Sequence, residues 1–272
     1  MGYQDPRYGQ SEQDLYVFSA SNVETARMCM YKFYLTTTQT HPIISRVMAI
    51  GSGVSKGADL DNKNKMVRGE PKKKKEIVEC AVEGYRGEVE EAEIREDPDM
   101  PDAKAIDATA AAATRYAEDV SPTLKKIRAS EQRLTYPIAD GIELAGTPDV
   151  ITDEGIGDFK TGKKWTQDKA DQTDQLTAYM ILHYREFGEY PSGMWIDSLS
   201  PNRGQYKHTR IPTWRTERDF QALVATIQMM VKALKSGIFM PTSQKSWWCS
   251  PKFCQFWHTC PYPCRGASCN GK

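Results

Sequence analysis

Two acids and a lysine lie close together in the middle of this sequence. Asp149 ends a Gly-Thr-Pro-Asp run that begins at Gly146, and Asp158 and Lys160 open an Asp-Phe-Lys-Thr-Gly run that ends at Gly162. Two carboxylates on one surface can hold a divalent cation that prefers oxygen ligands, such as Mg²⁺ or Mn²⁺. A neighbouring ammonium can position an attacking water or offset charge on a phosphate. These residue types suit a metal-dependent phosphodiesterase.

Short strands are predicted to position these side chains. The pattern predicts strands over 134–138, 142–151 and 156–160, joined by turns at 139–141 and 153–155. Because side chains alternate across a strand, Asp158 and Lys160 share one face. Asp149 joins them if the loop between the two strands has an even number of residues, as loops over 153–154 or 153–156 do.

A helix is predicted to follow, with Gln175 and Tyr179 on one face. Apolar residues recur at helical spacing from Leu176 to Phe187, and Gly188 provides the stop. Residues four apart on a helix are neighbours, so Gln175 and Tyr179 lie together. Taken alone, such a pair is more often an exposed amide and a half-buried phenol than a site.

The order of these residues resembles the RecB-like branch of the PD-(D/E)XK nuclease superfamily. In that branch the pattern reads Gly-x-x-Asp, a short gap, Asp-x-Lys-Thr-Gly, and later Gln-x-x-x-Tyr. The residues that carry the resemblance are Gly146, Pro148, Asp149, Asp158, Lys160, Thr161, Gly162, Gln175 and Tyr179. The resemblance implies an α/β fold, a restriction-endonuclease-like mixed sheet flanked by helices.

The same resemblance implies roles for individual residues. Asp149, Asp158 and the backbone carbonyl of Phe159 would hold one or two Mg²⁺ or Mn²⁺ ions. Lys160 would orient or activate the attacking water. Gln175 and Tyr179 would steady the DNA strand.

Seven cysteines form a second constellation. They are Cys29, Cys80, Cys249, Cys254, Cys260, Cys264 and Cys269. Their odd number, together with a nuclease core, indicates a reducing compartment, where clustered thiols more often bind metal than form disulfides. A capping box from Ser21 to Glu24 predicts a helix that carries Cys29 at its end. The Cys-x4-Cys-x5-Cys spacing from 249 to 260 lets three thiolates converge from one loop.

This arrangement resembles RecB-like nucleases that carry an iron–sulfur cluster. The resemblance implies a four-iron, four-sulfur cluster on Cys29, Cys249, Cys254 and Cys260, with a C-terminal cysteine-rich lobe packed against the N-terminal helix. Two features differ from the family: four residues rather than two separate the first two C-terminal cysteines, and Met30 stands where proline is common. The alternatives are a local Zn²⁺ site that uses Cys264, Cys269 or His258, and a Cys29 that is simply buried.

One expected metal ligand is missing. The segment from Gly51 to Gly57 resembles a family segment that carries a metal-binding histidine, but Ser55 occupies that position. Water, Asp59 or Asp61 would then complete the metal's ligands, or the domain has turned toward binding. Glu131 resembles a glutamate often found at the start of the core, where we expect a supporting role.

The composition predicts a globular protein with one substantial core. The chain has 272 residues, 39% of them apolar, and 36 basic against 36 acidic residues, so no bulk positive charge favours nucleic acid. The lysine-rich stretch 63–75 is either a solvated face or a phosphate-tracking patch. No apolar run reaches about 18 residues, and residues 1–15 do not resemble a secretory signal. We therefore expect a cytoplasmic protein without membrane contact, and the family resemblance implies a bacterium or a phage-infected cell as its setting.

The chain is expected to form a nuclease domain over 1–240 and a metal- or cluster-binding segment over 241–272. The domain would contain a helical region at about 60–130 and a catalytic core at about 130–215. Further elements are predicted as a helix over 103–117, strands over 194–199 and 206–211, and a helix from Thr216 to Gly237.

The chain's size and layout resemble exonucleases of bacteriophages and of CRISPR adaptation. The resemblance implies an exonuclease on single-stranded or frayed DNA, acting with proteins of replication, recombination or CRISPR adaptation. The alternative is a catalytically weak nuclease-fold module that binds DNA or a partner nuclease.

Overall fold

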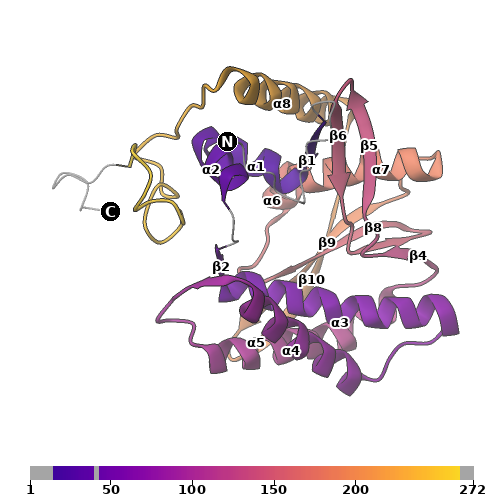
Figure 1. Ribbon diagram of the computed structural model, residues 1–272. Helices are drawn as coiled ribbons and strands as arrows, with labels where there is room; N and C mark the ends of the chain where they lie inside the picture. Colours follow the sequence, from indigo (N-terminus) through magenta and orange to yellow (C-terminus); the bar gives the residue numbers. More distant parts are fainter. Residues whose placement is uncertain (1–14, 40–42, 264–272) are drawn as a thin grey trace.

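A five-stranded mixed sheet lies at the centre of the protein (Figure 1). The computed structural model describes residues 15–39 and 43–263. In the sheet, β8 and β9 are parallel, and the other neighbouring pairs are antiparallel. Its strands, in spatial order, are β10 (Gln205–Thr213), β9 (Met194–Asn202), β8 (Gly155–Thr161), β7 (Val150–Thr152) and β4 (Ile127–Ser130).

One face of this sheet is covered by a smaller sheet and several helices. The smaller sheet contains β1 (Tyr16–Ser19), β6 (Ile142–Gly146) and β5 (Leu134–Ala139), in that order. The helices are α1 (Ala20–Met28), α2 (Met30–Thr38), α6 (Gln167–Gln172), α7 (Asp174–Phe187) and α8 (Glu217–Ser236). Helix α7 contacts β5 and β6 of the small sheet and β8 of the large one. It therefore joins the two sheets.

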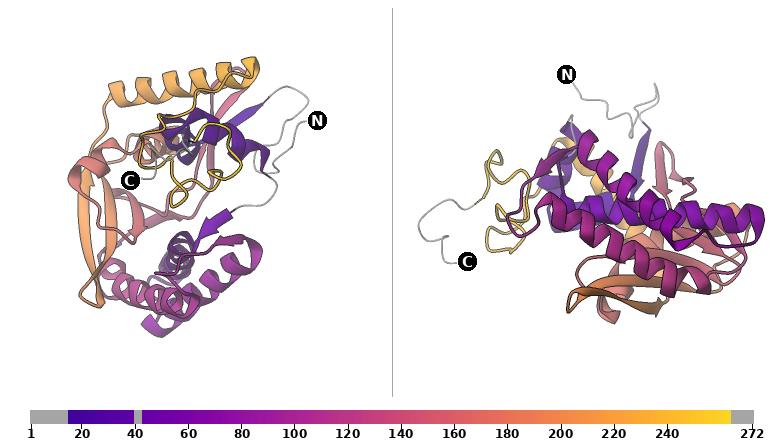
Figure 2. Two further views of the ribbon diagram at one scale, coloured as in Figure 1. Left: turned by 90° about the vertical axis from the view of Figure 1, so that its left-hand side faces the viewer. Right: turned by 90° about the horizontal axis from the view of Figure 1, so that it is seen from below.

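A helical lobe covers the opposite face, as Figures 1 and 2 show. Its elements are β2 (Ile43–Ser45), α3 (Arg46–Arg68), α4 (Lys74–Glu91), β3 (Glu93–Arg95), α5 (Asp102–Arg115), a π-helical turn η1 (Tyr116–Val120) and a 3-10 turn η2 (Ser121–Thr123). Helix α3 contacts β4 and β8, and α5 contacts β9 and β10. The predicted helical region is thus real, but it begins earlier, at Arg46.

Strand β8 contributes side chains to a different core on each face. Ile156 is fully buried in the core shared with α1, α7 and α8. Phe159 points the other way, into the core of the helical lobe, where its ring lies 5.3 Å from that of Tyr116. Burying a large apolar side chain contributes roughly 1.5–3 kcal/mol. The strand that carries Asp158 and Lys160 is therefore held firmly from both sides.

Several predicted elements agree with the structure. Helix α7 begins after Thr173, whose hydroxyl accepts a hydrogen bond from the backbone amide of Gln175, and ends at Gly188. Helix α8 begins after Thr216, which forms a capping box with Asp219, and ends at Gly237. The predicted helix over 103–117 and the strands over 194–199 and 206–211 correspond to α5, β9 and β10.

Two local predictions were wrong. The predicted strand over 142–151 is broken: β6 ends at Gly146, and β7 begins at Val150 in the other sheet. Pro148 lies in the break, and proline has no amide hydrogen to donate to a strand neighbour. The predicted capping box from Ser21 to Glu24 is also displaced, because the cap is Ser19, which pairs with Asn22.

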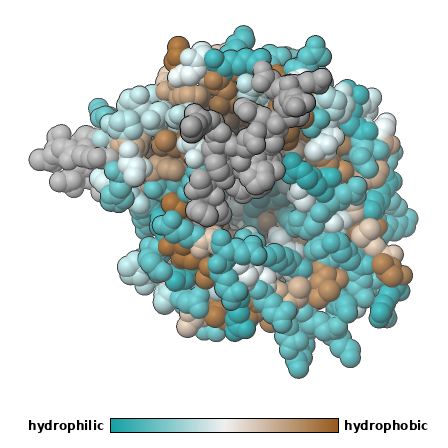
Figure 3. Space-filling view, in the orientation of Figure 1, coloured by the Kyte–Doolittle hydropathy of each residue, from teal (hydrophilic) through white to brown (hydrophobic). Residues whose placement is uncertain are grey.

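The lysine-rich stretch is largely neutralised by neighbouring acids. Five of its lysines form ion pairs with side chains of the helical lobe: Lys63, Lys65, Lys72, Lys74 and Lys75. Figure 3 shows a mainly hydrophilic face with hydrophobic residues in separate patches. These pairings favour a solvated face over a phosphate-tracking patch. None of the helices within the described ranges is long and apolar enough to cross a membrane.

Candidate active site

The hairpin of β7 and β8 brings Asp149 beside Asp158. A two-residue turn, Asp153 and Glu154, joins the strands, and Val150 pairs with Gly157. Asp149 directly precedes Val150, so it meets the hairpin opposite Asp158. The predicted even-numbered loop is confirmed. The backbone amide of Phe159 donates a 2.5 Å hydrogen bond to Asp149 Oδ2, which fixes that carboxylate against β8.

Asp158, which is buried, and Lys160, which is partly exposed, form an ion pair on the same face of β8. Lys160 Nζ lies 2.8 Å from Asp158 Oδ2, and Asp158 is 1% exposed. Burial lowers the pKa of Lys160, but the carboxylates of Asp158 and Asp149 more than offset this, so the pKa is raised. Lys160 is therefore an ammonium at neutral pH.

The two acids carry more negative charge than their surroundings compensate. Burial raises the pKa of Asp158 to about 7, and Lys160 only partly offsets it. Burial also raises the pKa of Asp149 to about 7, with the nearby Glu131 carboxyl adding to the rise. In addition, Asp158 Oδ2 is buried without a well-directed hydrogen bond. A cation between the two acids would lower both pKa values, because an opposite charge favours the ionised form.

The donor set of Asp149 and Asp158 fits a magnesium-like ion. Mg²⁺ is usually held by one or two carboxylates and keeps several waters. Across residues 15–39 and 43–263, no group of three or more His, Cys, Asp or Glu side chains is arranged to hold a metal ion. A site built on two carboxylates is consistent with that finding.

A hydrogen-bonded chain connects Lys160 to α7 and to the break before β7. Lys160 Nζ donates to Gln175 Oε1 at 2.5 Å, and Gln175 Nε2 donates to the Tyr179 hydroxyl at 2.7 Å. The Tyr179 hydroxyl donates to the Thr147 carbonyl at 2.9 Å. Tyr179 is only 4% exposed. The pair thus holds Lys160 and the Asp149 segment in one arrangement.

The glycine before the break allows this close approach. A Cβ atom added at Gly146 would lie 2.9 Å from Tyr179 Cε1 and 2.8 Å from Leu182 Cδ1. A larger residue at this position would displace the side chains of Tyr179 and Leu182.

The position expected to hold a histidine does face the site. Ser55, on α3, donates to Asp149 Oδ1 at 3.3 Å. Of the two acids considered as substitutes, Asp61 is fully buried elsewhere, where it pairs with Lys65 at 2.7 Å and accepts from the Ser121 hydroxyl. Asp61 therefore cannot serve this site. Asp59 pairs with Lys63 at 2.6 Å and lies close enough to raise the pKa of Glu131.

Two further acids lie near the site: Glu131, in the supporting position expected from the sequence, and Glu24, which the sequence analysis did not single out as a site residue. Burial raises the pKa of Glu131, which interacts with the Asp149 carboxyl, and its φ of +47° is unusual for a residue other than glycine. Glu24, on α1, accepts a 2.6 Å bond from the Thr173 hydroxyl, and its charge contributes to the raised pKa values of Asp158 and Lys160. No spacing pattern signals Glu24, because its helix reaches the site only through the fold.

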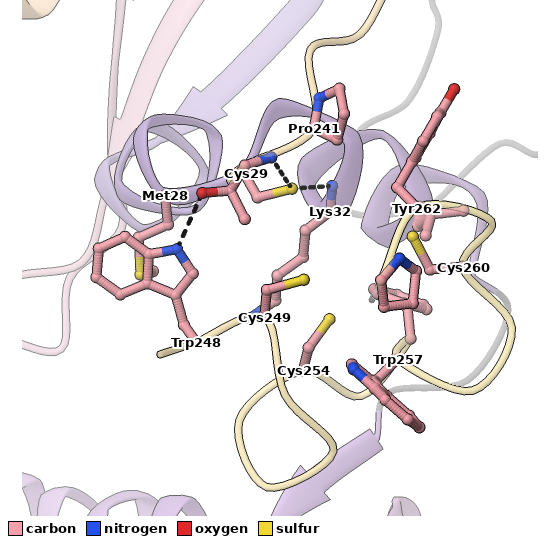
Figure 4. A pocket seen from close by; sticks show the side chains of 14 residues that line it. Met28, Cys29, Lys32, Pro241, Trp248, Cys249, Cys254, Trp257, Cys260 and Tyr262 are labelled. Carbon is pink, nitrogen blue, oxygen red and sulfur yellow. Dashed lines mark hydrogen bonds between the residues drawn. The ribbon is translucent and has the colours of Figure 1, made fainter. Parts of the chain in front are cut away.

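The four cysteines expected to bind a cluster line one pocket. Cys29, Cys249, Cys254 and Cys260 surround it, together with apolar residues such as Trp248 (Figure 4). Cys29 Sγ accepts bonds from the amides of Lys32 and Thr242, each at 3.4 Å. Burial raises the pKa of the Cys254 thiol.

Cys80, the other described cysteine, does not line this pocket. Cys80 lies on α4, where its thiol contacts the Lys56 carbonyl at 3.6 Å. Cys264 and Cys269 lie outside the described residues, so the local zinc site that would use them has no structural test. His258 is described, but it is not among the pocket's lining residues.

The C-terminal segment packs against the N-terminal helices. Phe239 stacks on Tyr34 with ring centroids 4.3 Å apart, and Tyr262 meets Tyr31 edge-on at 4.7 Å. Gln255 also donates to Gln39 at 2.7 Å. These contacts bring Cys29 to the same place as three cysteines that follow it by more than 200 positions.

Comparisons with known proteins place the chain among nucleases. The family model of the PD-(D/E)XK nuclease superfamily matches residues 17–261. No curated protein matches the sequence. Among solved structures, a candidate exonuclease from Eubacterium rectale superposes with a TM-score of 0.54 at 12% identity, covering 91% of this chain and 89% of that one. The protein SSO0001 gives a TM-score of 0.36 at 14% identity, covering 89% and 92%, which is too low to establish a shared fold.

Proposed function

We propose that this chain, which belongs to the PD-(D/E)XK nuclease superfamily, is a metal-dependent deoxyribonuclease whose active site is Asp149, Asp158 and Lys160. The observation that carries the proposal is the ion pair of the buried Asp158 with Lys160 beside Asp149, on a strand held from both faces. A purely structural ion pair would leave no reason for a second, partly buried acid at its side. Buried charges without full compensation are typical of functional sites.

The two carboxylates would hold Mg²⁺ or Mn²⁺, with the Phe159 carbonyl as a further oxygen ligand. The bound ion would supply a Lewis acid that withdraws charge from the phosphate. The remaining chemistry belongs to the chain. The Lys160 ammonium would orient a water by donating a hydrogen bond, and would stabilise the charge that develops on phosphate oxygens.

Gln175 and Tyr179 would act as positioning residues. Their hydrogen bonds run from Lys160 to the carbonyl that precedes Asp149 by two residues. Catalytic groups displaced by about 1 Å can lose about 100-fold in rate. This role differs from the direct DNA contact that the family resemblance implies, and it follows from the burial of Tyr179.

The substrate we propose is single-stranded or frayed DNA, cut from an end. The likeness to the Eubacterium rectale protein, a candidate exonuclease, supports cleavage from an end. The even charge balance also supports it, because a protein that grips a long duplex usually carries excess positive charge. Proteins of replication, recombination or CRISPR adaptation would be its partners.

The direct test is cleavage of end-labelled single-stranded and duplex DNA with Mn²⁺, with Mg²⁺ and with EDTA. Asp158→Ala and Lys160→Ala should each abolish metal-dependent cleavage while DNA binding persists. Glu154→Ala, an exposed acid in the same hairpin, is the matched control and should cleave normally. Cleavage that survives both active-site changes would refute the assigned chemistry.

A second candidate function rests on Ser55. This side chain reaches Asp149, yet a hydroxyl is a weaker metal ligand than an imidazole. A protein that binds DNA but does not cut it, whichever metal is added, would be a nuclease-fold binding module for DNA or for a partner nuclease. Ser55→His should then increase cleavage, whereas in an active nuclease the native residue already suffices.

We further propose that Cys29, Cys249, Cys254 and Cys260 bind a four-iron, four-sulfur cluster, with Zn²⁺ as the alternative. Their common pocket and its apolar surroundings support this assignment, because thiols that gather in a reducing compartment usually serve a metal. The four thiols are partly buried, and among the described residues they do not already stand as a preformed metal-binding group. The cluster would join the C-terminal segment to α1 and α2.

Metal analysis of anaerobically purified protein tests the cysteine proposal. Iron, sulfide and a broad visible absorption should be present and should be lost in Cys254→Ser. Cys80→Ser, whose thiol is remote from the pocket, should keep them. Zinc in place of iron would establish the alternative, and protein without either metal would contradict both.

A further inference from the structure

Three lysines beside the active site differ from those of the helical lobe. Lys163 and Lys164 lie in the loop between β8 and α6, and Lys169 lies in α6. All three are exposed, and none forms an ion pair with the described residues, unlike the paired lysines of stretch 63–75. The stretch 162–169 contains one acid, Asp168. We call Lys163, Lys164 and Lys169, with Trp165, the lysine loop.

The Trp165 ring lies near both Lys169 of the lysine loop and Lys160. Lys169 Nζ lies 4.4 Å from the centre of the Trp165 ring, and Lys160 Nζ lies 5.7 Å from it. Burial lowers the pKa of Lys169, and the charges of Lys163 and Lys160 lower it further, while Glu24 only partly offsets the lowering. Several cations thus gather at one place, and their mutual repulsion would be relieved by an anion.

The loop is held in position by its backbone. The Trp165 amide donates to the Ser198 hydroxyl of β9 at 3.2 Å, and Thr166 caps α6 by accepting from the Lys169 amide. A bound strand would therefore meet a prepared surface rather than a loop that must first be ordered, which saves conformational entropy on binding.

Exposed apolar side chains flank the loop on the helical lobe. A Cβ atom at Gly162 would lie 3.5 Å from Val47 Cγ1, so the start of α3 touches the start of the loop. Val47 is 41% exposed and its neighbour Met48 is 59% exposed. Such side chains can contact unpaired bases, whereas the bases of a duplex are stacked inside it.

We propose that the lysine loop binds the phosphate backbone of a single DNA strand next to the phosphate that is cut. The inference rests on the proposed function and names the surface that receives its substrate. Three unpaired cations within seven residues match a few successive phosphates, not the long footprint of a duplex. The Trp165 ring, between the loop and Lys160, offers an edge or face to a base at the active site.

Binding measured without catalysis tests the proposal. We would titrate a fluorescent oligothymidylate with the full chain in EDTA, at several salt concentrations. Replacing Lys163, Lys164 and Lys169 together by glutamine should weaken binding about 10- to 100-fold at low salt. The dependence of log affinity on log salt should also become shallower by about 2, since each phosphate contact with a single strand contributes about 0.7.

The matched control removes the same charge from paired lysines. Lys72, Lys74 and Lys75 replaced together by glutamine should bind within about twofold of the parent protein. If both triple variants lose affinity equally, the effect is net charge alone, and the proposal fails. Unchanged binding in the lysine-loop variant would also overturn it. Circular dichroism and thermal melts verify that both variants fold.

Further measurements separate this inference from the nuclease proposal and from a duplex surface. Trp165→Leu should reduce affinity for the single strand and leave the salt dependence unchanged, because it removes stacking and no charge.

A parent protein that cuts DNA while the lysine-loop variant binds normally would keep the nuclease and reject the surface. A parent protein that never cuts DNA, yet needs the lysine loop to bind it, would support the binding surface and reject the nuclease. Duplex bound more tightly than single strand through these lysines would contradict the single-strand assignment.

Discussion

Asp158 lowers the stability of the metal-free protein as the pH rises. Its pKa in the folded state is about 7, well above the ordinary value of 3.8, because it is buried. The folded protein therefore binds a proton more tightly than the unfolded chain does. Its contribution to stability is fully present below about pH 3.8 and is lost as the pH rises through about 7.

Asp158→Asn should consequently stabilise the metal-free protein at high pH. In EDTA at pH 8, we expect urea denaturation to show a gain of at most about 4 kcal/mol, and the gain should shrink toward pH 4. Mg²⁺ should stabilise the parent protein and have no effect on the variant.

Asp153→Asn provides the control for this prediction. Asp153 lies in the turn of the same hairpin, and its bond with Arg128 lowers its pKa, so its replacement should not stabilise the protein at pH 8. If the free energy of unfolding of the parent protein does not change between pH 5 and 8 in EDTA, the pKa of Asp158 is not raised in the folded state.

At the scale of the elements, the packing of α3 on α4 determines where Ser55 lies. A Cβ atom at Gly53 would come within 2.5 Å of the Ala81 carbonyl oxygen, and one at Gly57 within 2.7 Å of the Ile77 carbonyl oxygen. Both neighbours are backbone atoms that can move only with the whole helix. Ser55, between the two glycines, reaches Asp149 from this close contact.

Gly53→Ala should therefore separate the two helices. We expect a loss of about 1–3 kcal/mol in urea denaturation, since added atoms in a packed interior force the backbone apart. Metal-dependent cleavage should also fall, because Ser55 moves with α3.

Gly87→Ala is the corresponding change at an open position in α4. A Cβ atom there meets no atom within 4 Å, so the protein should gain up to about 1 kcal/mol from the better helix former. Equal effects of the two substitutions would contradict the assigned helix contact.

Elements with a local pattern could be predicted from the sequence. Helices α7 and α8 follow from their spacing and their Thr and Gly ends, and the shared face of Asp158 and Lys160 follows from strand alternation. These signals need only neighbours in the chain.

Features that depend on distant partners could not be predicted. Strand β1 is four residues long and exists because it pairs with β6, more than 120 positions away. Around Pro148 the chain leaves the small sheet and enters the large one, and this change also depends on strands that are distant in the sequence. Glu24 approaches Asp158 only when α1 is in place, and no pattern in the sequence signals it, whereas Glu131 could be singled out by its resemblance to a family glutamate. The roles of the site residues stay predictions that cleavage assays would test.

At the scale of the whole molecule, two cores rest on the same strands. Ile196 and Ile156 point into the core with α7, whereas Trp195 and Phe159 point into the helical lobe. Because each strand serves both faces, neither core can be lost while the other remains intact.

We therefore expect one cooperative unfolding transition. Leu176→Ala in the first core and Leu199→Ala in the second should each lower the free energy of unfolding by about 2–5 kcal/mol. Tryptophan fluorescence and far-ultraviolet circular dichroism should report the same midpoint for each variant. Two separate transitions, with only one shifted by each change, would instead show that the halves unfold independently.

The short hairpin at the centre of the site also bears on the order in which the protein folds. Asp149, Asp158, Lys160, Gln175 and Tyr179 lie within one brief stretch of chain, so their mutual contacts close only small loops. Contacts of this kind form quickly, and a chain made from its N-terminus folds as it emerges. The groups proposed for catalysis can therefore meet on the ribosome before the last helix and the distal cysteines have been synthesised.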